Sequence, residues 1–138
     1  MTSAAPLAPL PLAAILEAFS TTLEAGDGVA RLAMRRTDTT VGGFRGSING
    51  GVLASLVELA AHAPLATVLT PNEVIENTVD VSVTYLRPSL GDPTIAEGRV
   101  LRKGGRYAVC SVEVTHSQTG ELTVIGKVTL GLVRRTEA

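Results

Sequence analysis

The sequence predicts an α+β fold in which an antiparallel β-sheet wraps around one long central helix. A segment near the middle of the chain, residues 52–63, is apolar nearly all round, and a helix of this kind must be buried on most sides. After it the apolar residues recur with a period of two, which is typical of strands. Short turn sequences separate these runs, so neighbouring strands can pair antiparallel and cover the helix.

The N-terminal part of the chain is predicted to contribute one short helix. Residues 1–11 are rich in Ala and Pro, and we expect them to be flexible. Residues 12–23 predict an amphipathic helix, which the Gly-Asp-Gly sequence at residues 26–28 ends. A length of 138 residues suits a single domain with one core, which we expect to span residues 12–138.

Clear signals surround the central helix. Residues 29–36 alternate like a strand, and residues 37–47 form a polar, Gly-rich loop. Asn49 can then cap the helix through its side-chain oxygen. Pro64 is expected to kink the helix or to break it into a second piece, because proline lacks the N–H that continues the helix ladder.

Four strands are predicted in the C-terminal half of the chain. They cover residues 74–86, 94–103, 106–115 and 122–133. The sequences at residues 103–106 and 117–120 contain Gly and polar residues, and they are typical of hairpin turns. The predicted order is therefore helix, strand, long helix and four strands.

Composition argues against several classes of function. The formal net charge of -1 gives no basic surplus for binding nucleic acid. No uninterrupted apolar segment is long enough for a membrane span, and the sequence shows no metal-binding cysteine pattern. Cys110 is the one cysteine, so it cannot form an internal disulfide, and a cytoplasmic location is expected. Aromatic residues make up only 3%, and a core this poor in large rings favours burial by self-association.

Three polar residues share one stripe of the otherwise apolar helix: Ser55, Glu58 and His62. Their spacings of three, four and seven place them on one helical face. A buried carboxylate is costly unless it is paired or used. The stripe therefore either faces solvent or a subunit seam, or it carries a functional carboxylate at Glu58.

A family resemblance adds to this pattern. Residues 49–58 read NGGVLASLVE and resemble the His-Gly-Gly…Asp/Glu signature of PaaI-like hotdog-fold acyl-CoA thioesterases. Residues 78–88 read TVDVSVTYLRP, and the YLRP ending is typical of the same family. The hairpin LRKGGRYAV is similar to the penultimate turn of that family. The resemblance covers about residues 28–133 and implies a single hotdog thioesterase domain.

The resemblance implies a role for each matching residue. Gly50, at the start of the helix, would offer its backbone amide to the thioester oxygen, since a helix N-terminus favours developing negative charge. Glu58 would attack the thioester or activate water, and Thr78 would position that water or the carboxylate. Asn49 stands where the family commonly has His. Its side chain can cap the helix and donate a hydrogen bond, but it cannot act as an acid or a base. Thr78 read without the resemblance is an ordinary β-branched strand residue.

Further residues are predicted to bind the substrate. Coenzyme A carries phosphates and an adenine, and positive side chains beside flexible glycines suit them. His62 either lines the acyl pocket or packs at an interface. A solvated charged turn is the alternative interpretation for the cationic hairpin. The residues predicted to contact substrate or CoA are Gly51, His62, Arg87, Arg102, Lys103, Gly104, Gly105 and Arg106.

The sequence as a whole predicts hydrolysis of an acyl-CoA or aryl-CoA thioester to the free acid and CoA. No cofactor and no metal are expected, because CoA is part of the substrate. The alternatives are a hotdog enoyl-CoA hydratase or dehydratase and a non-catalytic acyl-CoA-binding protein. No membrane and no nucleic-acid partner is expected. The partner is predicted to be the chain itself, as a homodimer that assembles into a dimer of dimers, that is, a homotetramer.

The spacing of two residues predicts that each site is shared between chains. Gly50 and Glu58 are eight residues apart on one helix, which separates them by roughly 12 Å along its axis. One thioester carbonyl cannot contact both. Two such helices packed antiparallel across a two-fold axis would bring Gly50 of one chain beside Glu58 of the other.

Overall fold

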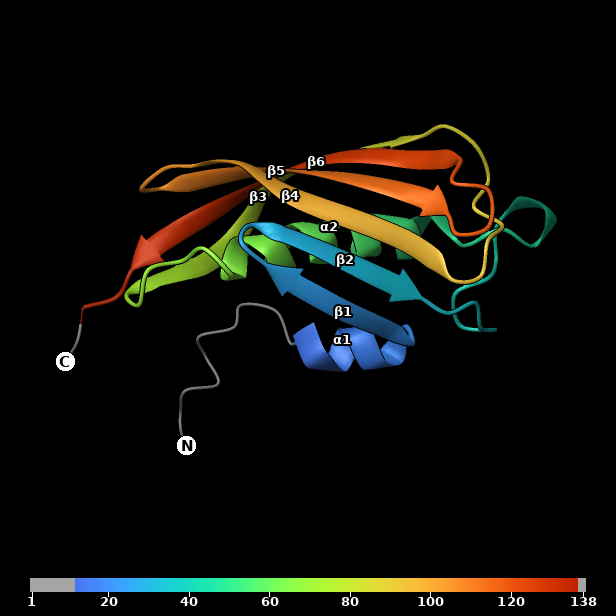
Figure 1. Cartoon of the computed structure of the whole chain (residues 1–138), viewed down its shortest axis with the longest axis horizontal. Coiled ribbons are helices and arrows are strands. Elements are labelled where there is room, and N and C mark those ends of the chain that lie inside the picture. Colours follow the sequence, from blue (N-terminus) through green and yellow to red (C-terminus); the bar gives the residue numbers. More distant parts are fainter. Residues whose placement is uncertain (1–11, 137–138) are drawn as a thin grey trace.

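A computed structural model describes residues 12–136 (Figure 1). The segment predicted to be flexible, residues 1–11, lies outside the described residues. The helices are α1 (Leu12–Ala18) and α2 (Gly50–Ala66), with a 3₁₀ turn at Phe44–Gly46. The strands are β1 (Thr21–Gly26), β2 (Val29–Met34), β3 (Glu73–Tyr85), β4 (Thr94–Lys103), β5 (Tyr107–His116) and β6 (Leu122–Arg134).

The strands form one six-stranded sheet in the order β1-β2-β4-β5-β6-β3, and every neighbouring pair is antiparallel. The sheet curves around α2, which lies against its inner face, while α1 lies beside β1 (Figure 1). The predicted α+β fold, an antiparallel sheet wrapped around one long helix, is confirmed. The four C-terminal strands begin and end within one residue of their predicted positions.

The core consists of aliphatic side chains from α2 and the inner face of the sheet. Leu56, Val57 and Leu59 of α2 are fully or almost fully buried. Glycine allows the sheet to approach the helix closely at Gly126, where an added Cβ would lie 2.5 Å from Val57 Cγ1. At Gly98 of β4, an added Cβ would overlap the backbone of α2. The contact between helix and sheet therefore depends on small residues as well as on aliphatic burial.

Pro64 was expected to kink the central helix or to break it into a second piece, and the second alternative was wrong. α2 continues through Pro64 to Ala66, and the Thr67 hydroxyl donates a 2.7 Å hydrogen bond to the Pro64 carbonyl. Pro64 cannot donate to the carbonyl four residues earlier, at Ala60. That carbonyl lies against Gly98, where the strand has no side chain to obstruct it. Tertiary packing on nearly every side holds the last turn in helical form.

The prediction of a helix over residues 12–23 was also wrong in its second half. α1 ends at Ala18, Ser20 has a positive φ of 50°, and the chain continues as β1. Asp27 and Gly28 have φ values of 54° and 79°, which fit a type I′ hairpin turn between β1 and β2. The Asp-Gly dipeptide is a strong hairpin signal, so this strand pair was detectable in the sequence.

Candidate functional site

The polar stripe of α2 meets β3 in a chain of hydrogen bonds. The Thr78 hydroxyl donates to Glu58 Oε2 at 2.5 Å. His62 Nε2 lies 3.1 Å from the same hydroxyl oxygen. Glu58 and Thr78 are half-buried, and His62 is buried with 5% of its surface exposed. Three of the residues that the sequence predicted as functional thus form one cluster.

Two irregularities in β3 allow Thr78 to face the helix. In a regular strand, the residues that share a face with buried Glu73 and Ile75 are the odd-numbered ones. The pairing of β3 with β6 shifts between Ile75 and Asn77, and again between Thr78 and Asp80. These β-bulges reverse the alternation twice, so that Thr78 points toward α2 and Asn77 lies against Gly131 of β6. Strict alternation would have pointed Thr78 away from Glu58.

His62 is a hydrogen-bond donor in this cluster. A hydroxyl carries one proton and can accept through its lone pairs. The Thr78 hydroxyl proton is directed at Glu58. The 3.1 Å contact between His62 Nε2 and the Thr78 oxygen is therefore a hydrogen bond only if Nε2 carries a proton and donates it. Burial lowers the pKa of His62 below its ordinary 6.5, and the nearby Glu58 charge opposes this in part. The imidazole is therefore neutral at neutral pH.

The N-terminus of α2 is open on one side. The Asn49 side-chain oxygen accepts from the N–H groups of Gly51 at 2.8 Å and Val52 at 3.3 Å, which confirms the predicted cap. The Gly50 N–H has no hydrogen-bond partner within the part of the chain that the structure describes. A free N–H at a helix start, aligned with the helix dipole, is suited to a developing oxyanion.

Tyr85 closes the other side of this helix start. Its hydroxyl donates a 2.6 Å hydrogen bond to the Gly50 carbonyl, although half of the residue (51%) is exposed. A hollow of about 360 Å³ lies beside it and is lined by Gly50, Leu53, Tyr85 and Arg87, among others. In the sequence, Tyr85 stands out only as part of the YLRP motif. That motif does not show that the tyrosine contacts the start of α2.

Glu58 and Gly50 are kept apart within one chain. Both belong to the continuous helix α2, so the spacing of eight residues again corresponds to roughly 12 Å. Ser55 lies between them on the stripe, and its hydroxyl donates back to the Gly51 carbonyl at 3.0 Å. The chain thus presents two separate half-sites, a carboxylate cluster and a helix N-terminus.

The cations predicted to bind CoA lie at two opposite ends of the sheet. Arg102, Lys103 and Arg106 surround the turn between β4 and β5, where Gly104 N–H donates to the Tyr107 carbonyl at 2.8 Å. Arg87 follows the end of β3, beside the start of α2, and pairs with Glu121 at 2.5 Å. One chain does not gather these side chains into a single phosphate site.

Lys103 already has an anionic partner. Its ammonium lies 2.7 Å and 2.9 Å from the two carboxylate oxygens of Glu73, whose side chain is only 3% exposed. Hydrogen bonds from Lys103 and from the Thr70 N–H lower the pKa of Glu73 from 4.5 to about 2. Among the described residues, Arg102 and Arg106 form no ion pair. They are therefore the free cations of this hairpin, with Gly105 between Lys103 and Arg106.

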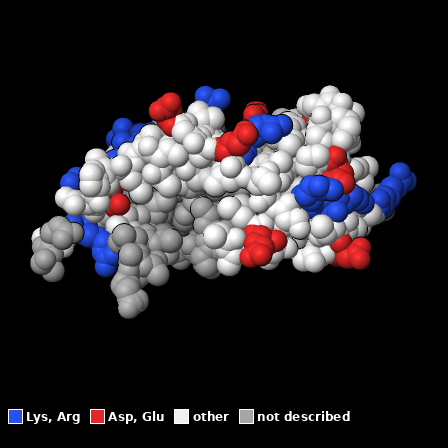
Figure 2. Space-filling view, turned by 60° about the horizontal axis from the view of Figure 1, so that its bottom comes forward, with Lys and Arg blue, Asp and Glu red and all other residues white. Residues whose placement is uncertain are grey.

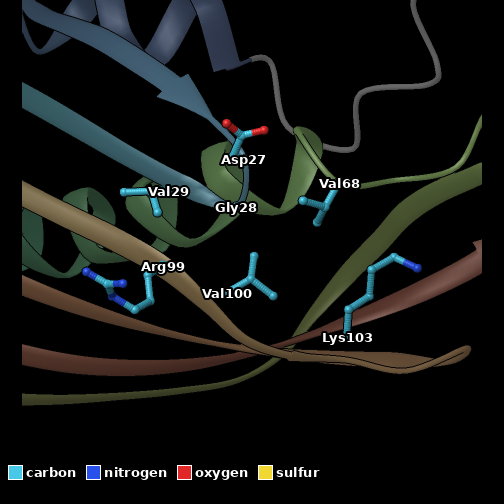
Figure 3. Close-up of a pocket in the computed structure, with 7 residues that line it drawn as sticks. All are labelled: Asp27, Gly28, Val29, Val68, Arg99, Val100 and Lys103. Atoms are coloured by element: carbon cyan, nitrogen blue, oxygen red, sulfur yellow. The ribbon is translucent and has the colours of Figure 1, made fainter.

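A second hollow, of about 350 Å³, lies near the C-terminal end of α2 (Figure 3). The β1–β2 turn, Val68 and β4 form its walls. Val68 and Val100 face its centre, while Arg99 and Lys103 lie toward its edges (Figure 3). Its lining contains no part of the Glu58 cluster, so it is separate from both half-sites.

The remaining features are structural. Cys110 is fully buried, and burial raises the pKa of its thiol to about 11.

No group of three or more potential ligands that could hold a metal occurs within residues 12–136. None of the helices in that range is long and apolar enough to cross a membrane. On the face shown in Figure 2, acidic and basic side chains are interspersed.

Comparison with known proteins identifies the family of this chain. The family model of the thioesterase superfamily matches residues 45–123, a segment that contains Glu58, His62 and Thr78. The medium/long-chain acyl-CoA thioesterase YigI of Escherichia coli is 33% identical over 102 residues, which is 64% of this chain and 66% of that protein. The chain covers less than two thirds of the length of the curated relatives that it matches first.

Solved structures share the fold. A thioesterase from Haemophilus influenzae has a TM-score of 0.79 at 19% identity, with 88% of this chain and 84% of that chain covered. A protein from Bacillus halodurans, crystallised with CoA, has a TM-score of 0.77 at 17% identity, with 88% and 80% covered. The predicted hotdog fold is thus confirmed.

Proposed function

Because this chain belongs to the thioesterase superfamily, we propose that it hydrolyses an acyl-CoA or aryl-CoA thioester to the free acid and CoA. The observation that carries the proposal is the half-buried Glu58 carboxylate, which the Thr78 hydroxyl holds at 2.5 Å and which no cation among the described residues neutralises. Such a carboxylate is available as a nucleophile or as a general base. The naming of YigI as an acyl-CoA thioesterase supports the choice of substrate class.

The chemistry requires one water and no redox step. Either Glu58 takes a proton from water, which attacks the thioester carbon, or Glu58 attacks that carbon and water cleaves the resulting anhydride. In both cases a C–O bond forms, the C–S bond breaks, and the CoA sulfur leaves and takes up a proton. The free Gly50 N–H would stabilise the carbonyl oxygen as it gains charge, with the Asn49 amide beside it.

We further propose that the two half-sites meet across a two-fold axis. Within residues 12–136, β3 is an edge strand that pairs with β6 alone, and it exposes Val79 (50%) and Val81 (40%). An unpaired strand edge with apolar side chains is suited to pair with a second copy. With two α2 helices antiparallel, Gly50 of one chain would face Glu58 of the partner subunit. The proposed assembly is a homodimer and, beyond it, a dimer of dimers.

The same two-fold axis would unite the separated cations. The turn that carries Arg102 and Arg106 lies at the end of the sheet opposite to Arg87. An antiparallel partner would bring its own hairpin toward the Arg87 end. We propose that the CoA phosphates bind there, with Gly104 and Gly105 allowing a close approach to the backbone. A cytoplasmic location stays a prediction from the single cysteine.

A thiol-release assay over short, long and aromatic acyl-CoAs tests the function. Release of CoA with appearance of the free acid is the expected result. Hydration of an enoyl-CoA would instead favour a hydratase, for which the neighbouring His62 is the one specific argument. Tight binding without thiol release would favour a non-catalytic acyl-CoA-binding protein. Either of these results without hydrolysis would overturn the proposal.

Mixed dimers test the shared site. Glu58→Ala and Asn49→Ala are expected to be weak alone, and a purified mixed dimer carrying one of each should recover one intact site of two. Its rate should therefore approach half that of the parent. A mixed dimer no faster than the average of the two single variants would show that each site lies within one chain.

A further inference from the structure

The His62 side chain has no role in the reaction as described above, yet it is the most buried member of the cluster. Its exposed fraction is 5%, and its Nε2 is directed at the Thr78 hydroxyl rather than at a hollow. The two hollows of about 350 and 360 Å³ do not include His62 in their lining. The geometry therefore favours a role through Thr78 over direct contact with the acyl group.

The distances indicate where the protons lie. Thr78 Oγ1 is 2.5 Å from Glu58 Oε2 but 3.1 Å from His62 Nε2. The single hydroxyl proton of Thr78 cannot be donated to Glu58 and to His62 at once. The shorter of the two distances is typical of a hydrogen bond to a charged carboxylate, so the proton is directed at Glu58. If Nε2 carried no proton, it would face the lone pairs of the hydroxyl oxygen. The arrangement is consistent only when Nε2–H donates to Thr78 and Thr78 donates to Glu58.

We propose that His62 is a positioning residue, whose Nε2–H orients the Thr78 hydroxyl toward Oε2 of Glu58 and thereby leaves Oε1 free to react. This inference rests on the proposed thioesterase function for its catalytic meaning. A hydroxyl hydrogen rotates to suit its neighbours, and His62 fixes it by occupying an acceptor position on the oxygen. Burial holds the imidazole neutral, so that it donates without placing a cation beside the carboxylate.

Substitutions of His62 separate this role from simple packing. Glutamine can place an amide N–H near the position of Nε2, whereas leucine cannot donate. We expect His62→Leu to lower kcat about tenfold with little change in KM, and His62→Gln to recover most of the loss. In a Thr78→Val background, where the relay is already broken, His62→Leu should have no further effect on kcat. A full tenfold loss in that background, or equal losses for Gln and Leu, would overturn the proposal.

Nitrogen-15 NMR of the imidazole provides a test that does not need activity. The parent at neutral pH should contain the Nε2–H tautomer of His62, with a slowly exchanging proton, and Thr78→Val should accelerate that exchange. A dominant Nδ1–H tautomer would refute the relay even if the enzyme is active. An inactive parent with the Nε2–H tautomer would refute the thioesterase function and not the geometry. The tautomer also decides the case if His62→Leu does not fold.

Discussion

Two glutamates on neighbouring elements are both held by short hydrogen bonds, but their partners differ. The side chain of Glu73, at the start of β3, is 3% exposed and contacts the Lys103 ammonium with both oxygens. Glu58, on α2, is half-buried and contacts the uncharged Thr78 hydroxyl through one oxygen. The cation lowers the pKa of Glu73 to about 2, which leaves it a very weak base.

The difference favours Glu58 over Glu73 as the reactive carboxylate of the proposed mechanism. A nucleophile or base must have an oxygen that is not occupied and a charge that is not already neutralised. Glu73 meets neither condition, because both of its oxygens contact Lys103 and the ammonium neutralises its charge. This ion pair is a structural link between β3 and β4. Glu58 meets both conditions, since a neutral hydroxyl orients it without cancelling its charge. Burial alone would have selected Glu73.

The largest expected effect separates the two glutamates by activity. Glu58→Gln keeps the size of the side chain but removes its charge, so kcat should fall by about 10³ or more. Glu73→Gln should leave kcat of the folded protein within about twofold of the parent, because it does not touch the site. Steady-state thiol release, normalised to folded protein, measures both. Comparable losses of kcat in the two variants would show that Glu58 and Glu73 do not differ in this way.

The second prediction concerns stability and uses the partner cation. Lys103→Met leaves the buried Glu73 charge without a partner, and it should lower the free energy of unfolding by about 3 kcal/mol. Glu73→Gln should lower it less, by about 1–2 kcal/mol, because the Lys103 side chain is 22% exposed and can reach water. The double variant should be more stable than Lys103→Met alone. Urea unfolding of all three variants measures this, and a double variant less stable than both single ones would contradict it.

The third prediction concerns the free cations of the β4–β5 turn. Reversing Arg102 and Arg106 to Glu should raise KM about tenfold at low salt and weaken its dependence on salt, since salt screens phosphate attraction. Arg31→Glu, on β2, is a control for charge reversal away from this turn and should change KM little. The measurement is KM across a series of salt concentrations. An unchanged KM at low salt would place the nucleotide elsewhere.

Much of this arrangement could be predicted from the sequence. Period-two alternation located the four C-terminal strands, and the Asn-Gly-Gly start and the uniformly apolar helix identified α2 as the buried centre. Glu58 was identifiable as a rare polar residue on that helix. The signals were strong because packing and local preference agree at these positions.

Other features depend on tertiary contacts that a sequence pattern does not report. The two bulges of β3 cause Thr78 to face Glu58, and the alternation of residues 73–85 in the sequence does not predict them. Pro64 remains helical because Gly98 leaves room for a carbonyl, which requires knowing that β4 crosses α2 there. The ion pair of Lys103 with Glu73 joins residues thirty positions apart. β1 is the exception, because the Asp27-Gly28 dipeptide is a hairpin signal in the sequence, although such residues can also end a helix.

The smallest expected effect concerns pH, and it separates His62 from Glu73 by the range in which each acts. The folded pKa of His62 lies below 6.5, so the unfolded chain takes up a proton more readily as the pH falls. The stability that comes from the neutral imidazole is complete above pH 6.5 and is lost as the pH falls below it. The folded pKa of Glu73 is also lowered, to about 2, so its contribution is complete above pH 4.5 and is lost as the pH falls from 4.5 to about 2.

Urea unfolding at a series of pH values should show two separate declines. His62→Gln should remove only the upper one and Glu73→Gln only the lower one, whereas Glu113→Gln, an exposed control on β5, should remove neither. If His62→Gln leaves the decline below pH 6.5 unchanged, the imidazole is not buried as a neutral donor, and the hydrogen-bond chain from His62 through Thr78 to Glu58 would have to be redrawn.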